Sequence, residues 1–360
     1  MSSQYELSEP PSDVISALKF APGSSTRLLV SSWDRHIYLY ETPSPLESSD
    51  SFLEMRIEHR APVLDICFGA DGNTAFSAGL DHDVSHINLD TGRKTVLSTH
   101  DKPARHVVYS PEHNILISSG WDNTLHIHVV ELENGALSHG PSSVSIPSTP
   151  HAISVSPSKL VVAMASRQVF IYDLATLQQL ASQSAPTSDN SITPLVIEPW
   201  QQREPALKYM IRAVACMPND EGFAISSIEG RVGVEMFDPS EEAQLKKYAF
   251  KCHRTSTEEE EDIVYPVNAL AFHPVKTNVF ASAGGDGTVI LWDGANKRRI
   301  RAFPGLESGV QAMAWAGDGT VAAIGTSPGF EDGTEEIDPK LVKVYIRAVS
   351  DSDLKSRGKA

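Results

Sequence analysis

The apolar and polar positions along the chain recur in short units of one kind. Each unit has a run of small or apolar residues, then an acidic turn, then a strand in which apolar and polar residues alternate. The clearest unit spans residues 281–293, and weaker copies span 30–40 and 117–127. A unit of this size cannot bury its own apolar face, so the copies have to stack on one another.

The acidic turns give the spacing of the units. Most successive turns are about 40–50 residues apart, as expected for four short strands and their connections. Two later gaps are longer, and the excess falls in the polar stretches 182–207 and 239–263, which predict surface insertions in connecting loops. The turns lie at Asp34, Asp81, Asp122, Ser166 (where the acid is lost), Glu229 and Asp286, with a degenerate seventh near 325–327.

An innermost-strand candidate precedes every turn. Most of these strands end in a turn signal such as Ala-Pro, His-Pro or Gly-Asp-Gly. Seven units predict an all-β, seven-bladed β-propeller of four-stranded blades, built as one domain over residues 1–348 with a flexible tail at 349–360. Residues 4–7 are expected to supply the outer strand of the last blade and so to close the ring. The candidates are residues 14–20, 63–68, 104–109, 151–155, 211–216, 267–272 and 310–315.

Charge and hydropathy exclude two classes of partner. The 360 residues carry a formal net charge of −16, which disfavours duplex nucleic acid because phosphate binding needs a basic footprint. The longest apolar runs, such as residues 160–165, are far too short to span a bilayer. The net charge of the whole chain does not exclude a local basic patch on its surface.

Serine, histidine and aspartate recur in a way that resembles a catalytic triad. One set per blade is better explained by hydrogen bonds that hold the blade turns than by repeated catalysis, and no G-x-S-x-G elbow is present. We therefore expect no catalytic residues and no enzyme. The sets comprise His59, His100 and His253 before innermost strands, Asp81, Asp122 and Asp286 at turns, and Ser77, Ser118 and Ser282 four residues earlier.

Metal and cofactor sites are not expected either. His126 and His128 alternate within one strand, so both rings point the same way, but no cysteine or acidic cluster accompanies them. We interpret them as solvent or interface histidines. The glycines lie at turns between strands, where a positive φ is needed, and none opens a helix that could hold a phosphate.

The meander topology places several ligand-binding residue types at one end of the ring. The four strands of a blade are called a to d from the innermost outward. The b–c turn and the connection from strand d to strand a of the next blade lie at the same end of the ring. Trp33 and Trp121 directly precede b–c turns, and Arg231 follows one. Lys251 ends the neighbouring strand d, so it should lie close to Arg231, and Arg212 opens strand a of the same blade. Aromatic residues with arginine are typical of peptide-binding surfaces, and grouped cations suit carboxylates or a phosphorylated side chain.

Three segments carry a resemblance to a known family over essentially the whole chain, from about residue 5 to 348. They are SSIEGRVGVE (226–235), YAFKCHR (248–254) and YPVN (265–268). The chain resembles the WD-repeat mitotic checkpoint proteins that carry the Bub kinase to kinetochores, and the related WD-repeat mRNA-export factors of the nuclear pore. The early start of the first blade and the segments SSWD (31–34) and GLDH (79–82) match the checkpoint branch.

This resemblance implies a non-enzymatic adaptor of the spindle assembly checkpoint, without cofactors, in the nucleus and at mitotic kinetochores. Its partners would be the GLEBS motif of a checkpoint kinase or of its pseudokinase relative, and phosphothreonine MELT repeats of a kinetochore scaffold. Arg212 matches the arginine that pairs with GLEBS glutamates, and Trp33 and Trp121 match aromatic residues of that surface. Arg231 and Lys251 match the phosphothreonine-binding pair. A monomeric propeller within hetero-complexes is expected.

The sequence leaves three other interpretations open. The export branch would bring a nucleoporin GLEBS partner and single-stranded RNA, which needs a basic groove with stacking aromatic residues. The second is an enzyme in which one Ser-His-Asp set departs from the others. The third is a scaffold without phospho-dependence. The chain departs from the family in its long acidic insertions and in the eroded turn at Ser166.

Overall fold

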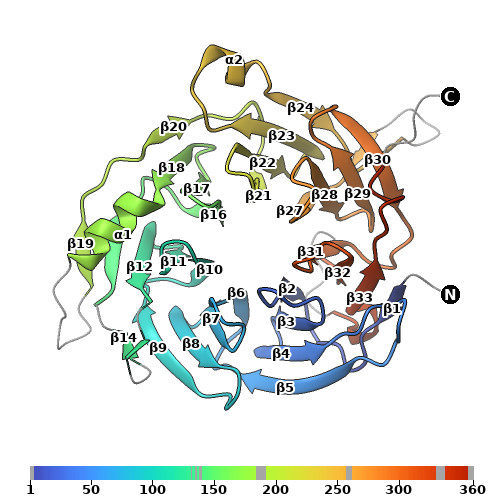
Figure 1. Cartoon of the computed structure of the whole chain (residues 1–360), viewed down its shortest axis with the longest axis horizontal. Coiled ribbons are helices and arrows are strands. Elements are labelled where there is room, and N and C mark those ends of the chain that lie inside the picture. The colour runs from blue at the N-terminus through green and yellow to red at the C-terminus, as the bar shows by residue number, and fades with distance from the viewer. Residues whose placement is uncertain are drawn as a thin grey trace.

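A computed structural model gives the fold of this chain as a ring of seven blades around a central channel (Figure 1). It describes residues 4–130, 132–133, 136–137, 140–183, 192–256, 262–329 and 337–355. The architecture is all-β apart from two α-helices and one 3-10 turn in this part of the chain, which confirms the predicted seven-bladed propeller. None of the described helices is long and apolar enough to cross a membrane.

Blades 1 to 4 follow the predicted meander, and their innermost strands begin within a residue of the expected positions. Blade 1 contains β2 (Ile15–Phe20), β3 (Arg27–Ser32), β4 (His36–Glu41) and β5 (Phe52–Glu58). Blade 2 contains β6 (Val63–Phe68), β7 (Thr74–Gly79), β8 (Asp83–Asn88) and β9 (Lys94–Thr99). Blade 3 contains β10 (Ala104–Ser110), β11 (Ile115–Gly120), β12 (Thr124–Val129) and β15 (Ser142–Ser145), and blade 4 contains β16 (Pro150–Val155), β17 (Lys159–Met164), β18 (Val169–Asp173) and β20 (Gln201–Arg203).

Blades 5 to 7 complete the ring. Blade 5 contains β21 (Ile211–Cys216), β22 (Gly222–Ser227), β23 (Arg231–Met236) and β24 (Tyr248–Lys251). Blade 6 contains β27 (Val267–Phe272), β28 (Val279–Gly284), β29 (Val289–Asp293) and β30 (Arg298–Phe303). Blade 7 contains β31 (Val310–Trp315), β32 (Val321–Thr326), β33 (Lys343–Ala348) and β1 (Gln4–Glu6).

Burial explains why the strands differ in sequence. The second strand of a blade is covered on both faces by neighbouring blades, and every residue of β11, β22, β28 and β32 is buried. Such strands read as continuous runs of apolar and small residues. The outermost strand β5 alternates between exposed and partly covered positions, so it keeps the alternating pattern. The apolar cores therefore lie between blades.

The N-terminus closes the ring as expected. β1 pairs antiparallel with β33, with Tyr5 opposite Ile346, so the first and last strands share one blade. Leu7 is buried in the cluster between blades 7 and 1. Beyond β33, where a flexible tail is predicted, Leu354 is buried and Asp353 pairs with Arg301. Residues 356–360 of that tail lie outside the described residues.

The two predicted insertions contain secondary structure of their own. The first is preceded by α1 (Leu174–Ser182) and includes β19 (Thr193–Leu195), which joins blade 3 as a fifth strand, parallel to β15. The second includes α2 (Glu241–Gln244) and the hairpin β25 (Arg254–Ser256) and β26 (Asp262–Val264). Most of its acidic run, residues 258–261, lies outside the described residues. A third, short hairpin, β13 (Leu132–Glu133) with β14 (Ala136–Leu137), follows β12.

The ring has two ends, an upper rim and a lower rim. The upper rim carries the b–c turns and the d–a connections, and the lower rim carries the a–b and c–d turns. In blade 5, for example, the b–c turn between β22 and β23 lies on the upper rim, and α2, between β23 and β24, lies on the lower rim. All predicted ligand-binding residues are expected on the upper rim.

Candidate functional site: the upper rim and the channel mouth

The Ser-His-Asp sets are parts of the blade turns. In blade 6, His253 Nδ1 lies 2.8 Å from Asp286 Oδ1 and its Nε2 lies 2.8 Å from Ser282 Oγ, which also accepts from Trp292 Nε1 at 2.9 Å. His100 makes the same contacts with Asp122 and Ser118 in blade 3. The three serines are completely buried, so no substrate carbonyl could reach them. In blades 3 and 6 these hydrogen bonds hold the preceding strand d to the turn. In blade 2, His59 Nε2 lies 3.0 Å from Ser77 Oγ, and no hydrogen bond joins His59 to Asp81 among the described residues.

The prediction that His126 and His128 face solvent or an interface is wrong. Both rings are buried. They do point the same way, because His126 Nδ1 and His128 Nε2 each lie 3.0 Å from Ser98 Oγ in the outer strand of blade 2. The sequence pattern alone did not reveal that blade 2 covers this face of β12.

One group among the described residues has the composition of a metal site. The ligand atoms of His100, Asp122 and His126 all lie within 4.8 Å of one another. The rings of His100 and His126, however, stack face to face with centroids 3.6 Å apart and planes at 7°. Lone pairs in parallel rings do not converge on one point, as tetrahedral coordination requires. These residues are better described as a hydrogen-bonded stack than as a metal site.

Arg231 and Lys251 lie side by side on the upper rim of blade 5. They are direct cross-strand partners in the register of β23 and β24. On the other side of β23, Arg231 pairs with Ser227 of β22, and Ser227 pairs with Ile211 of β21, the residue before Arg212. Arg231 is held by Glu229, with Nε 3.4 Å from Oε2, and its side chain is 36% exposed. Lys251 is exposed and forms no ion pair within the described residues. An anion at this edge of the blade would meet two cations.

The innermost strands share one irregularity that shapes the channel mouth. In every blade the pairing of strand a with strand b shifts around its second residue, a β-bulge that turns this side chain away from the ladder. Several of these residues bond to the next blade: Arg212 Nε donates to Asn268 Oδ1 at 3.0 Å, and Asn268 Nδ2 donates to Val310 O at 3.0 Å. The bulged residues are Ser16, Leu64, Arg105, His151, Arg212, Asn268 and Gln311.

A groove of about 420 Å³ opens at this mouth and brings three of the predicted residues together. Trp33, Trp121 and Arg212 all line it. The two indoles occupy equivalent positions, since Trp33 N donates to Val14 O and Trp121 N donates to Pro103 O. Trp121 is 37% exposed. Arg231 and Lys251 do not line this groove, so the structure places the predicted residues of the upper rim in two adjoining groups rather than a single one.

The groove contains a second arginine that was not predicted. Arg105 lines it from β10, and its Nη1 donates to Leu64 O at 3.0 Å. Burial lowers the pKa of Arg105, the Asp65 carboxylate partly restores it, and Arg212 lowers it further. The signal was available in the sequence, because Arg105 occupies the same second position of its innermost strand as Arg212 does.

One carboxylate offsets part of this positive charge. Burial alone would raise the pKa of Asp65, but the hydrogen bond from His106 and the charge of Lys19 bring it below its usual range. Asp65 is therefore ionised, and it also accepts from Val107 N at 3.1 Å. With Lys19, Arg105 and Arg212 around one aspartate, the channel mouth is locally positive in a chain of net charge −16. Such a mouth suits a peptide that presents carboxylates.

The seven blades, with the Trp-Ser-His-Asp network of blade 6 and the Ser-His-Asp network of blade 3, define a WD-repeat propeller protein. A family model described as WD domain, G-beta repeat, matches residues 92–128 and 250–293. The chain is 39% identical to the mitotic checkpoint protein BUB3.1 of Arabidopsis thaliana, over 98% of this chain and 95% of that protein. It is 34% identical to the mitotic checkpoint protein bub3 of Dictyostelium discoideum, over 96% and 95%.

The chain belongs to the Bub3 family of mitotic checkpoint proteins, which are WD-repeat adaptors of the spindle checkpoint. mRNA-export factors are close relatives. The Poly(A)+ RNA export protein of Schizosaccharomyces pombe is 29% identical over 98% of this chain and 93% of that protein. The resemblance inferred from the blade 5 and blade 6 segments is confirmed.

Proposed function

We propose that this propeller is a non-enzymatic adaptor that binds two kinds of peptide on its upper rim. The channel mouth, with Arg212, Trp33 and Trp121, binds the GLEBS motif of a checkpoint kinase or its pseudokinase relative. Arg231 and Lys251 bind phosphothreonine in MELT repeats of a kinetochore scaffold. The protein thereby recruits its checkpoint partners to kinetochores in mitosis and resides in the nucleus.

The observation that carries this proposal is the adjacency of the two sites. Arg231 is the cross-strand partner of Lys251, and the same row of blade 5 leads to Arg212 in the aromatic groove. A paired cation site suits a doubly charged phosphate. A locally positive groove with two tryptophans suits an acidic peptide with apolar side chains. We further propose that residues 1–348 fold as one unit and act as a monomer within hetero-complexes.

Replacing Arg212 by glutamate is expected to release the GLEBS partner. The substitution places a carboxylate where the proposal has an arginine facing glutamates, and like charges in contact are destabilising. We expect at least about a tenfold weaker interaction with a GLEBS peptide, measured by isothermal titration calorimetry. Lys102→Glu is the matched control, because Lys102 is an exposed cation of the upper rim outside the groove. Equal affinity for Arg212→Glu and wild type would contradict the assignment.

A second function is favoured by one finding, the similarity to the RNA-export protein. An export factor would bind single-stranded RNA, which requires a basic track with aromatic platforms. The groove at the channel mouth combines cations with two tryptophans, in a chain of net charge −16. A filter-binding assay at physiological salt distinguishes the two functions, since the checkpoint proposal expects no RNA retention, and retention abolished by Arg212→Glu would favour the export function.

A further inference from the structure

A groove on the lower rim, away from the proposed peptide sites, lies in the seam between blades 5 and 6. Its volume is about 460 Å³, within the range of about 300–1,000 Å³ that is typical of ligand pockets. Val234 and Met236 of β23 and Tyr248 of β24 form one wall. Phe272 and Phe280 of blade 6 form the other wall.

The groove exists because one side chain is missing from a repeating position. In every blade, the residue directly after strand c (β33 in blade 7) donates its backbone N–H to a carbonyl of the a–b turn. Five of these residues belong to the apolar cluster that fills the seam between their own blade and the preceding one. A sixth, Thr42, is completely buried. In blade 6 the residue is glycine. The equivalent residues are Thr42, Leu89, Val130, Leu174, Phe237, Gly294 and Val349.

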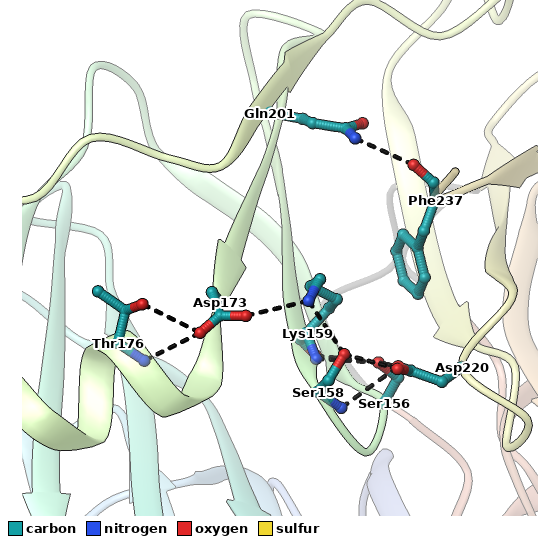
Figure 2. Close-up of polar contacts among 8 residues, drawn as sticks. All are labelled: Ser156, Ser158, Lys159, Asp173, Thr176, Gln201, Asp220 and Phe237. Carbon is teal, nitrogen blue, oxygen red and sulfur yellow. Dashed lines mark hydrogen bonds and ion pairs between the residues drawn. The ribbon is translucent and has the colours of Figure 1, made fainter. Parts of the chain in front are cut away.

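The neighbouring seam shows what a filled position looks like. Between blades 4 and 5 the buried ring of Phe237 occupies the equivalent space, and Gln201 Nε2 donates to its carbonyl at 3.0 Å (Figure 2). Asp220 closes the rim there by accepting from Ser156 and Ser158 of blade 4, with Ser158 Oγ at 2.6 Å (Figure 2). The seam between blades 5 and 6 is spanned at its rim by Tyr248 Oη, which donates to Gly294 O at 3.0 Å.

The backbone does not explain the glycine. Gly294 is not in the left-handed region that favours glycine. A Cβ built there would lie 3.1 Å from Asn278 O and 3.6 Å from both Phe280 Cε1 and Tyr248 Oη. A side chain at this position would therefore extend between the two walls once the Asn278 carbonyl has moved by a few tenths of an ångström. Empty apolar space of this kind forfeits packing that the other seams have, and an external side chain can restore it.

The rim of the groove selects the charge of the occupant. Lys246 and Lys297 are exposed and line it, opposite a single exposed carboxylate, Glu221. The nearby Glu235 is already neutralised by Lys247 at 2.9 Å and Arg203 at 3.5 Å. Asp238, also exposed, lies near Lys246. The residues that line the groove therefore carry two cations and one carboxylate, in a chain of net charge −16. Charge complementarity favours a negatively charged occupant.

An exposed leucine marks the same edge. Leu245 lines the groove and is 76% exposed. It directly follows α2, whose N-terminus is capped by Ser240 and whose Gln244 donates to Met236 O at 3.2 Å. These contacts hold Leu245 at the mouth of the groove, where most of its apolar side chain faces solvent.

We propose that this seam is a docking site for a short acidic peptide segment of a partner protein, with one large apolar side chain inserted beside Gly294. Lys246 and Lys297 contact carboxylates on either side of that anchor. This site is separate from the upper-rim sites and does not depend on their assignment. It would allow the propeller to hold a further partner while both upper-rim sites are occupied.

Two short fluorescein-labelled peptides test the proposal by anisotropy. Both carry a central Leu-Phe pair, flanked by glutamates in one and by lysines in the other. The glutamate peptide is expected to bind the full-length protein at least about tenfold more tightly than the lysine peptide, with an affinity that falls as salt rises from about 0.1 to 1 M. No binding of the glutamate peptide at about 1 mM, or equal binding of both peptides, would overturn the proposal.

Gly294→Val is the decisive variant, because valine is the residue at the same position in blade 7. It is expected to fill the seam, leave the melting temperature unchanged or raised, and weaken the glutamate peptide at least about tenfold. Gly317→Val is the matched control, since Gly317 is an exposed lower-rim glycine that also lacks a positive φ. Unchanged peptide binding by folded Gly294→Val would refute the site.

Charge variants locate the peptide. Lys246→Glu with Lys297→Glu is expected to weaken the glutamate peptide at least about tenfold, whereas Arg93→Glu, at the equivalent c–d turn of blade 2, leaves it unchanged. Loss of binding in Arg231→Ala with Lys251→Ala would instead place the peptide on the upper rim and overturn the proposal. So would a dimer in sedimentation velocity that Gly294→Val dissolves, because the groove would then hold a second copy of the chain.

Discussion

Replacing Arg231 and Lys251 together by alanine is expected to reduce the preference for a phosphorylated over an unphosphorylated MELT peptide about a hundredfold. A phosphothreonine carries about −1.5 to −2 charges, and each hydrogen bond to a charged group contributes about 1.5–3 kcal/mol. Both side chains lie at an exposed edge, so the lower end of that range applies. Calorimetry with the two peptides on wild type and variant measures the ratio.

A charge-matched control separates local recognition from general attraction. Arg35→Ala with Lys102→Ala removes two exposed cations from the upper rims of blades 1 and 3. This variant has the same net charge as the double variant in blade 5, and we expect it to keep the preference for phosphate. An equal loss in both variants would indicate long-range attraction, and an unchanged ratio in the blade 5 variant would disprove the phosphothreonine site.

The register of blade 5 shows why the paired cations could be predicted from the sequence. Arg231 follows a b–c turn and Lys251 precedes a d–a connection, and an antiparallel meander places these two ends opposite each other. The pairing of Arg231 with Lys251 required no knowledge of side-chain packing. Residues 4–7 supply one strand's worth of chain before blade 1, and they complete the last blade by pairing with β33.

Features that depend on contacts between blades could not be predicted in this way. His126 and His128 read as exposed because the sequence does not state which blade covers which strand face. Strand β19 joined blade 3 although it belongs to the connection within blade 4. The missing side chain at Gly294 is defined by the backbone hydrogen bond that makes one position in each of the seven blades equivalent. Local pattern fixes strands, whereas the seams are set by the pairing of distant segments.

Acidification from pH 6.5 to 5 is expected to remove about 6 kcal/mol from the free energy of unfolding. Burial lowers the pKa of His126 and of His128 to about 3, and the charge of His100 adds to both effects. Burial and the charge of Lys94 lower the pKa of His59 to about 4. The unfolded chain takes up protons below pH 6.5 and the folded chain does not, so each histidine costs about 2 kcal/mol of stability over this interval.

The sign of the effect follows from which groups titrate in this window. The pKa of Asp122 lies far below its usual range, because the hydrogen bond and the charge of His100 outweigh burial. Asp122 therefore stabilises the folded protein fully at any pH above 3.8, the pKa of the carboxyl in the unfolded chain, and this contribution is lost only at lower pH. Asp81, whose pKa is raised by burial and by Asp83, acts in the opposite sense. Four further histidines with lowered pKa, His86, His106, His151 and His273, add to the loss.

Urea denaturation at pH values from about 7.5 to 5 tests this expectation, because about 6 kcal/mol is a large part of the 5–15 kcal/mol by which proteins are stable. The slope of the unfolding free energy against pH is the informative quantity, since it counts protons and does not depend on how well a replacement packs. His126→Gln is expected to lower that slope by about 1.4 kcal/mol per pH unit. A slope that His126→Gln and His59→Gln both leave unchanged would show that these rings are protonated in the folded protein, and the lowered pKa of the buried histidines would have to be abandoned.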